Sequence, residues 1–303
     1  MSIPKFLDYL RIEKKYSLRT IESYSNDLMD FQDYYTSETN SKDLTKAQKL
    51  IFRNYLMKLS ESGLSERSIN RKISSLRSYY KFLLKTAEIS QSPLAGFHFL
   101  KHTNKVQVPF SEDEMTSLFE TEGIFPDSFE GRRDRLVMEL FYQTGIRRSE
   151  LIHLKVSDID FDQETIKVIG KGSKMRILPV GGVLLDAIDN YIVERLNEFP
   201  SAGYELFLTN KGKAFYDKFV YNLVNSYLSL ISTKQKKSPH MLRHSFATHM
   251  LNRGANLNVI KEFLGHSSLA ATQVYTHSSV DQLKKVFNQA HPRSEKKLNK
   301  YDN

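Results

Sequence analysis

The 303-residue chain contains no cysteine, and this absence excludes several classes of protein at once. Without a thiol there is no disulfide, no thiolate zinc site, no iron–sulfur cluster and no cysteine nucleophile. No apolar run approaches the roughly 18 residues that a membrane span needs, and residues 1–17 lack the apolar stretch of a signal peptide. The sequence therefore predicts a folded cytoplasmic protein without a membrane segment.

The chain also has fewer acidic than basic residues. The chain has 44 Lys and Arg against 35 Asp and Glu, a net charge of +9, and residues 1–103 carry 17 basic and 11 acidic side chains. The length corresponds to about two domains of roughly 150 residues each. A cationic surplus of this size indicates a polyanionic partner but does not demonstrate one.

Residues 1–103 show helical periodicity and no strand alternation. Apolar residues recur three or four positions apart in four stretches, at about 3–10, 18–31, 50–59 and 66–85. Ser17 and Ser65 precede two of these stretches as typical N-caps. These features predict a small helical domain over residues 1–103, followed by a linker over 104–109.

Residues 110–290 combine helices with a short β meander. Ser111 and Glu114 have the spacing of a capping box. Between residues 156 and 180, three runs of alternating apolar residues are separated by turn sequences, which predicts a three-stranded antiparallel sheet. Helices are predicted again from about residue 184, including 239–254, 256–265, 269–276 and 280–290. The predicted fold is mainly α with a small three-stranded antiparallel sheet (an α+β domain), and residues 291–303 form a frayed polar tail.

The predicted helix at 66–85 has a polar face without a carboxylate. At 100° per residue, a group of cations and hydroxyls falls within about 80° of arc, namely Arg67, Arg71, Ser74, Ser78, Lys81 and Lys85. Cations neutralise phosphates, and hydroxyls allow close approach to a nucleic-acid backbone. A merely solvated face usually mixes both signs of charge. This face is predicted to contact DNA.

Three histidines, His240, His244 and His249, raise the question of a metal site. His240 and His244 have the i,i+4 spacing of a zinc pair. Arg243 lies between them and opposes a cation, and the glutamate base of a zinc protease is missing, so no metal is predicted. His240 and Arg243 fit an anion site better, because they project from the first turns of a helix, where the dipole favours negative charge.

Other segments are weak signals alone and specific together. Arg147 follows an apolar helix at a glycine break, and Lys171 lies between two glycines. His266 is followed nine residues later by Tyr275 in Tyr275-Thr276-His277. With His240 and Arg243, these residues have the order and spacing of one family. Along nearly its whole length the chain resembles the tyrosine recombinases and integrases, and most closely the XerC/XerD type.

The resemblance implies a site-specific recombinase that cuts and rejoins DNA with chemistry like that of a type IB topoisomerase. Tyr275 would be the nucleophile and would form a 3′-phosphotyrosine intermediate. The implied catalytic residues are Arg147, Lys171, His240, Arg243, His266 and Tyr275, with Glu150 and His244 as supports. No cofactor is implied. Arg148 stands where the family commonly has a small apolar residue, and it is interpreted as structural.

The resemblance also implies an assembly and a cellular role. The two domains would form a clamp on double-stranded DNA. Strand exchange would need a homo- or hetero-tetramer on two recombination sites, with a sister recombinase and an FtsK-type translocase as candidate partners. The leading role is resolution of chromosome dimers during segregation and cell division. The alternatives are an integrase or transposase of a mobile element and, in another class, a non-cleaving architectural DNA-binding factor. The apolar stripe of the final helix fits a neighbouring subunit or its own domain equally well.

Overall fold

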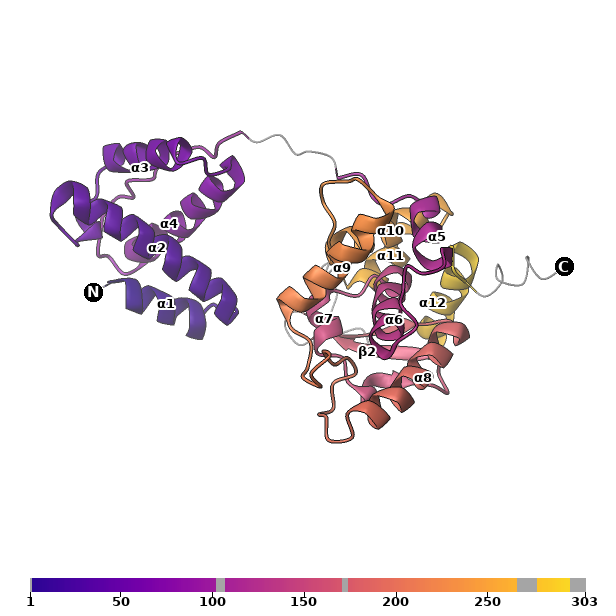
Figure 1. Cartoon of the computed structure of the whole chain (residues 1–303). Helices are drawn as coiled ribbons and strands as arrows, with labels where there is room; N and C mark the ends of the chain where they lie inside the picture. The colour runs from indigo at the N-terminus through magenta and orange to yellow at the C-terminus, as the bar shows by residue number, and fades with distance from the viewer. Residues whose placement is uncertain (1, 102–106, 171–173, 266–276, 295–303) are drawn as a thin grey trace. The chain divides into compact units, whose positions relative to one another are not determined.

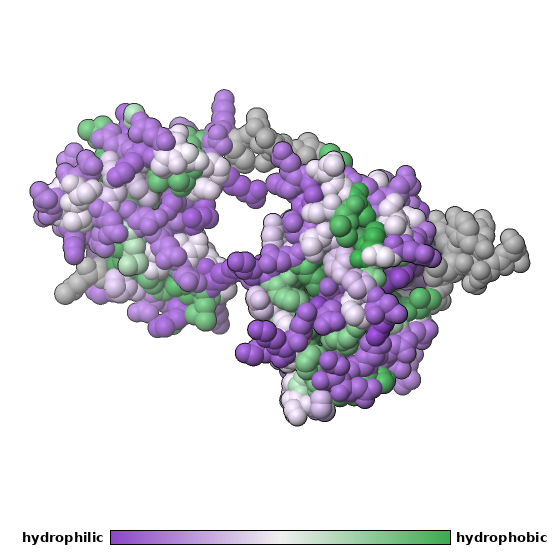
Figure 2. Space-filling model, in the orientation of Figure 1, coloured by the Kyte–Doolittle hydropathy of each residue, from purple (hydrophilic) through white to green (hydrophobic). Residues whose placement is uncertain are grey.

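The computed structural model describes residues 2–101, 107–170, 174–265 and 277–294. The chain divides into two compact units, Met1–Val106 and Gln107–Asn303 (Figure 1). Hydrophilic side chains cover most of the face of both units that Figure 2 shows, and apolar side chains reach it in small patches. Within the described ranges, no helix is long and apolar enough to cross a membrane.

The described regular structure of the first unit is entirely helical, as the periodicity predicts. It consists of α1 (Ser2–Ile12), α2 (Leu18–Thr39), the 3-10 helix η1 (Leu44–Lys46), α3 (Lys49–Glu61) and α4 (Glu66–Lys85). The hydroxyls of Ser17 and Ser65 accept hydrogen bonds from backbone N–H groups in the first turns of α2 and α4. The predicted N-caps are therefore confirmed. Aromatic rings fill the core of this unit, and the Phe31 and Phe52 rings stack with centroids 4.6 Å apart.

Helices also dominate the second unit. They are α5 (Glu112–Glu120), α6 (Phe129–Thr144), α7 (Arg148–Ile152), α8 (Gly182–Glu198), α9 (Asp217–Ile231), α10 (Pro239–Asn252), α11 (Leu257–Leu264) and α12 (His277–Ala290). The capping box of Ser111 and Glu114 is present at the start of α5. Helix α6 is buried along most of its length and packs against α8 and α10 (Figure 1).

The predicted β meander is confirmed. After the 3-10 helix η2 (Val156–Asp158), β1 (Ile159–Asp160), β2 (Thr165–Ile169) and β3 (Met175–Pro179) form an antiparallel sheet in the order β1-β2-β3. Ile166 lies opposite Ile159 on one side and Leu178 on the other. Alternation along β3 therefore places Arg176 and Leu178 on the same buried face.

The chain after α12 is not frayed at its start, contrary to the expectation for residues 291–303. His291 is fully buried, its Nδ1 accepts from the Arg293 backbone N–H, and its Nε2 donates to the Tyr142 carbonyl oxygen at 3.2 Å. Arg293 forms an ion pair of 2.7 Å with Glu139 of α6. These polar side chains find partners on α6, so residues 291–294 pack into the unit.

The two alternatives for the apolar stripe of the final helix are also decided for its described part. Leu283 and Phe287 are buried in the core of their own unit, and Val286 is partly buried there. The stripe therefore packs on its own domain. The helix predicted at 269–276 lies outside the described residues.

Candidate active site

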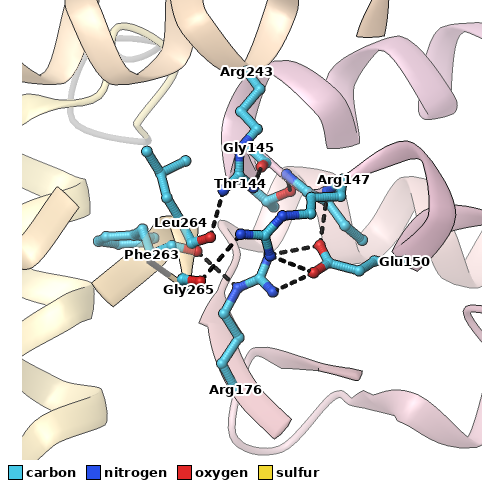
Figure 3. A network of polar contacts seen from close by, with 10 residues as sticks. Thr144, Gly145, Arg147, Glu150, Arg176, Arg243, Phe263, Leu264 and Gly265 are labelled. Atoms are coloured by element: carbon cyan, nitrogen blue, oxygen red, sulfur yellow. Dashed lines mark hydrogen bonds and ion pairs between the residues drawn. The ribbon is translucent and has the colours of Figure 1, made fainter. Parts of the chain in front are cut away.

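Three arginines meet at the C-terminal end of α11 (Figure 3). They come from β3, from α10 and from the turn between α6 and α7. Each donates to one of three consecutive carbonyl oxygens: Arg176 to Phe263 at 2.8 Å, Arg243 to Leu264, and Arg147 to Gly265 at 3.1 Å. The last carbonyls of a helix lack intrahelical partners and carry partial negative charge, so they attract cations. This helix end therefore gathers three guanidinium groups from distant parts of the chain.

A buried carboxylate, Glu150, holds two of these guanidiniums. Its Oε1 accepts from Arg147 Nη1 at 2.8 Å and from Arg176 Nη1 at 2.7 Å. Its Oε2 accepts from the backbone N–H of Arg147 at 2.7 Å and from Arg176 Nη2 at 2.8 Å. Burial alone would raise the pKa of Glu150, but the hydrogen bonds and charge of Arg176 and the contacts of Arg147 outweigh burial and lower the pKa to about 2. Glu150 is therefore ionised at neutral pH.

Arg243 is less exposed to solvent than Arg147. Its guanidinium is buried and also donates to the Gly145 carbonyl oxygen at 2.5 Å. Burial first, then the positive charges of Arg147 and Arg176, lower the pKa of Arg243 to about 9, so it stays charged at neutral pH. Three guanidiniums and one carboxylate give the cluster a net charge of about +2. An anion bound nearby would stabilise the charged guanidiniums.

The local backbone explains how Arg147 reaches this place. Gly145 is the C-cap of helix α6 and adopts the left-handed conformation with φ of 60°. A Cβ at Gly145 would come within 2.7 Å of the Phe246 ring, so the turn packs tightly on α10. Arg147 then stands at the N-cap of α7, where Glu150 accepts its backbone N–H. The glycine break thus turns the chain so that Arg147 faces the end of α11.

The structure brings together Arg147, Arg243 and Glu150 of the predicted site. His240 is exposed in the first turn of α10, three residues before Arg243. The ring of His244 is half-buried, with its Nε2 lying 3.2 Å from the carbonyl oxygen of Gln107.

The remaining three predicted catalytic residues, Lys171, His266 and Tyr275, lie outside the described residues. The described residues immediately before two of them do lie against the arginine cluster. A Cβ at Gly170 would be 3.0 Å from Glu150 Oε1, and Gly265 accepts from Arg147.

Arg176 has no role in the site predicted from the sequence. Its guanidinium is buried and engages both oxygens of Glu150. The signal was present, because the alternation that predicts β3 places Arg176 on the face of Leu178. A cation on a core-facing strand position needs a buried partner. Arg148, which was interpreted as structural, forms an ion pair of 2.9 Å with Asp217 of α9.

On α4, the polar face has exposed cations at Arg67 and Lys81 and half-buried hydroxyls at Ser74 and Ser78. Arg71 is about half exposed, and it donates to the buried Asp27 carboxylate of α2 at 2.5 Å. The face is free of carboxylates on α4 itself, as the sequence indicates. The neighbouring helix nevertheless supplies one to Arg71.

Comparison with known proteins identifies the family. The model named phage integrase family matches residues 109–282, and the model of the phage integrase N-terminal SAM-like domain matches residues 3–87. Tyrosine recombinase XerC of Chlorobaculum tepidum is 36% identical over 315 positions, covering 96% of this chain and 94% of the relative. Tyrosine recombinase XerC of Staphylococcus aureus (strain USA300 / TCH1516) is 37% identical and covers 96% of each chain.

The fold is also that of a known structure. XerH site-specific recombinase in its post-cleavage complex with palindromic difH substrate superposes with a TM-score of 0.71 at 24% identity, covering 94% of this chain and 83% of that one. The resemblance stated from the sequence motifs is confirmed. The chain belongs to the phage integrase family, the tyrosine recombinases, which cut and rejoin DNA through a phosphotyrosine intermediate.

Proposed function

We propose that Arg147 and Arg243 hold the scissile phosphate of double-stranded DNA while Tyr275 attacks it. The observation that carries the proposal is the cluster of guanidiniums at the end of α11, directly before His266 in the chain. Forked N–H donors match the non-bridging oxygens of a phosphate, and their charge stabilises the negative charge that grows there during attack. A site already assembled around a helix end needs little reorganisation when DNA arrives.

The proposed reaction balances without a cofactor. The phenolic oxygen of Tyr275 forms a bond to phosphorus, and the bond from phosphorus to the 5′ oxygen breaks. His240 and His266 position the phosphate and take up the phenolic proton, while Lys171 donates a proton to the departing 5′ oxygen. The 3′-phosphotyrosine ester retains the energy of the broken phosphodiester bond. Attack by a 5′-hydroxyl on this ester therefore rejoins DNA without ATP.

The direct test is covalent trapping. The protein is incubated with a candidate site that carries a nick beside the scissile phosphate, so that the short cut fragment diffuses away and rejoining stops. We expect an adduct that survives SDS, with the linked peptide containing Tyr275 by mass spectrometry. DNA binding without an adduct on any such site would favour the non-cleaving architectural factor.

Cleavage in excess EDTA is expected to match cleavage in magnesium. Two guanidiniums and an ammonium already supply the positive charge that a metal ion would bring to the phosphate. The measurement is the single-turnover rate on the nicked substrate, with ionic strength held constant because magnesium also screens DNA binding. Loss of cleavage in EDTA that added magnesium restores would contradict the proposed roles of the arginines.

We also propose that the polar face of α4 lies against DNA phosphates, so that the two domains together clamp the duplex. Its exposed cations, Arg67 and Lys81, support this. Arg71, Ser74 and Ser78 complete the proposed face, and Arg71 would then exchange its contact with Asp27 for a phosphate.

Replacing Arg67 and Lys81 together with alanine is expected to lower the salt dependence of DNA binding. Each lost phosphate contact reduces the slope of log affinity against log salt by about 0.9, so the double variant should lose about 2. The measurement is fluorescence anisotropy over a salt series. The control is Lys46→Ala in η1, where the lysine pairs with Asp43 at 3.6 Å. Equal slopes in the double variant and the wild type would remove α4 from the interface.

We assign the chain to chromosome dimer resolution, as a tetramer on two recombination sites in the cytoplasm. The XerC relatives, which match along 96% of the chain, support this over the mobile-element alternative. Recombination between two copies of a site from the host chromosome tests it, first with this protein alone and then with a sister recombinase or an FtsK-type translocase. Recombination only at the ends of a mobile element would favour the alternative.

A further inference from the structure

We propose that Arg176 is a positioning residue that fixes the aim of Arg147 and ties the β2–β3 hairpin to the end of α11. The inference rests on the function proposed above, and it concerns a side chain for which that function has no role. The side chain of Arg176 is 5% exposed, against 33% for that of Arg147. Nε, Nη1 and Nη2 of Arg176 all donate to protein acceptors, so Arg176 is not placed to bind a substrate.

Glu150 connects Arg176 to Arg147. Arg176 grips both carboxylate oxygens with Nη1 and Nη2, at 2.7 and 2.8 Å. A bidentate pair of this kind fixes the plane of the carboxylate. The same two oxygens hold Arg147 at its backbone N–H and at Nη1. The orientation of Arg147 is therefore set through Glu150 by Arg176.

Arg176 also contacts the end of α11. Its Nε donates to the Phe263 carbonyl oxygen, three residues before His266. Gly265 packs on its stem, since a Cβ there would lie 3.2 Å from Cδ of Arg176. Gly265 also has φ of 58°, so a larger residue would be strained as well as crowded.

Arg176 is itself part of the β2–β3 hairpin. Arg176 pairs with Val168 across β2 and β3, and Gly170 closes the described base of the same hairpin by donating to the Lys174 carbonyl oxygen at 2.8 Å. Lys171 follows Gly170 in the chain. One guanidinium thus joins the segment that leads to Lys171, the segment that leads to His266, and Arg147.

Electrostatics give this role a signature that simple packing would lack. Glu150 is faced by Arg147 from the α6–α7 turn, by Arg176 from β3, and at longer range by Arg243 from α10. The hydrogen bonds and charge of Arg176 are the strongest of the influences that lower the pKa of Glu150 against burial. Without Arg176, the effect of burial is opposed less strongly. The pKa of Glu150 is then higher than in the wild type, and Glu150 takes up a proton at a higher pH. A neutral carboxyl group holds Arg147 less firmly, so activity is lost earlier on the acid side.

The test uses Arg176→Gln and Arg176→Lys in the full chain, with single-turnover cleavage of the nicked substrate measured across pH. Arg176→Gln is expected to cleave about 10²-fold more slowly, because small displacements of catalytic groups have effects of that size. The acid limb of its pH–rate profile, where cleavage slows as pH falls, should move to higher pH. Its DNA affinity should stay at the wild-type value. Arg176→Lys retains the charge but not the fork, so it should keep an acid limb nearer to that of the wild type and still cleave more slowly.

The matched control is Arg195→Gln. Arg195 is another buried arginine of the same unit, 3% exposed, and it donates to the Gly203 and Glu205 carbonyl oxygens. The Arg195→Gln substitution should lower the melting temperature without changing the pH–rate profile of the folded enzyme.

A wild-type cleavage rate and pH–rate profile in Arg176→Gln would overturn the inference. So would a loss of cleavage rate no larger than that of Arg195→Gln at equal folded fraction. Should Arg176→Gln not fold, a wild-type rate in Arg176→Lys would overturn it. Absence of any adduct with the wild-type protein would instead overturn the proposed function.

Discussion

Replacing Tyr275 with phenylalanine is expected to abolish the covalent protein–DNA adduct and leave DNA binding intact. The substitution removes the one oxygen that bonds to phosphorus and keeps the ring, so no phosphotyrosine ester can form. The guanidiniums that we propose bind the phosphate are unchanged. The measurement is the SDS-resistant band on the nicked substrate, with affinity determined separately by fluorescence anisotropy.

Matched controls are needed because the chain has 16 tyrosines. Tyr216→Phe and Tyr221→Phe make the same chemical change at exposed positions in the second unit, which are 57% and 43% exposed. Both variants should form the adduct at the wild-type rate. An adduct that persists in Tyr275→Phe and maps to another tyrosine would refute the assignment of the nucleophile.

Replacing Arg243 with lysine is expected to slow cleavage on the order of 10²–10³-fold, the effect of losing a donor to a developing oxyanion. The guanidinium of Arg243 donates to the carbonyl oxygens of Gly145 and Leu264 and, in our proposal, keeps further N–H groups for the phosphate. A lysine ammonium keeps the charge but lacks the planar fork, so it cannot satisfy both carbonyls and a phosphate in the same geometry. Single-turnover cleavage at saturating protein isolates the chemical step from binding.

Arg253→Lys is the control for this experiment. Arg253 caps the other end of α10, where it pairs with Glu112 in the same unit. The change from arginine to lysine is identical, but the residue is absent from the arginine cluster. Its cleavage rate should stay within about twofold of the wild type, as expected for a partly exposed ion pair. A wild-type rate in Arg243→Lys would remove Arg243 from the phosphate site.

The sequence predicts most secondary structure because the determinants are local. Ser17, Ser65, Ser111 and Asn256 stand at helix starts and satisfy backbone N–H groups within the next three residues, which requires no knowledge of the rest of the chain. The meander follows from alternation with a period of two, for the same reason. The motif spacing around Arg147, Arg243 and Tyr275 also identifies the family, since the order of residues along the chain is itself the signal.

Contacts between distant segments could not be predicted from these local patterns. On a helical wheel of residues 66–85 the polar face shows no carboxylate, yet Asp27 of α2 contacts Arg71. Polarity alone predicts a frayed chain at residues 291–294, but partners on α6 bury His291 there.

The sequence by itself determined the family, the helices and the sheet of this protein, and it supplied the motifs from which the catalytic residues are predicted. Only the tertiary structure decided that Arg176, Glu150 and Arg147 form one unit at the end of α11. The physical reason is that an ion pair or a hydrogen bond between distant segments depends on which faces pack together. Partners such as Arg176 and Phe263, 87 positions apart, meet only once the core has formed.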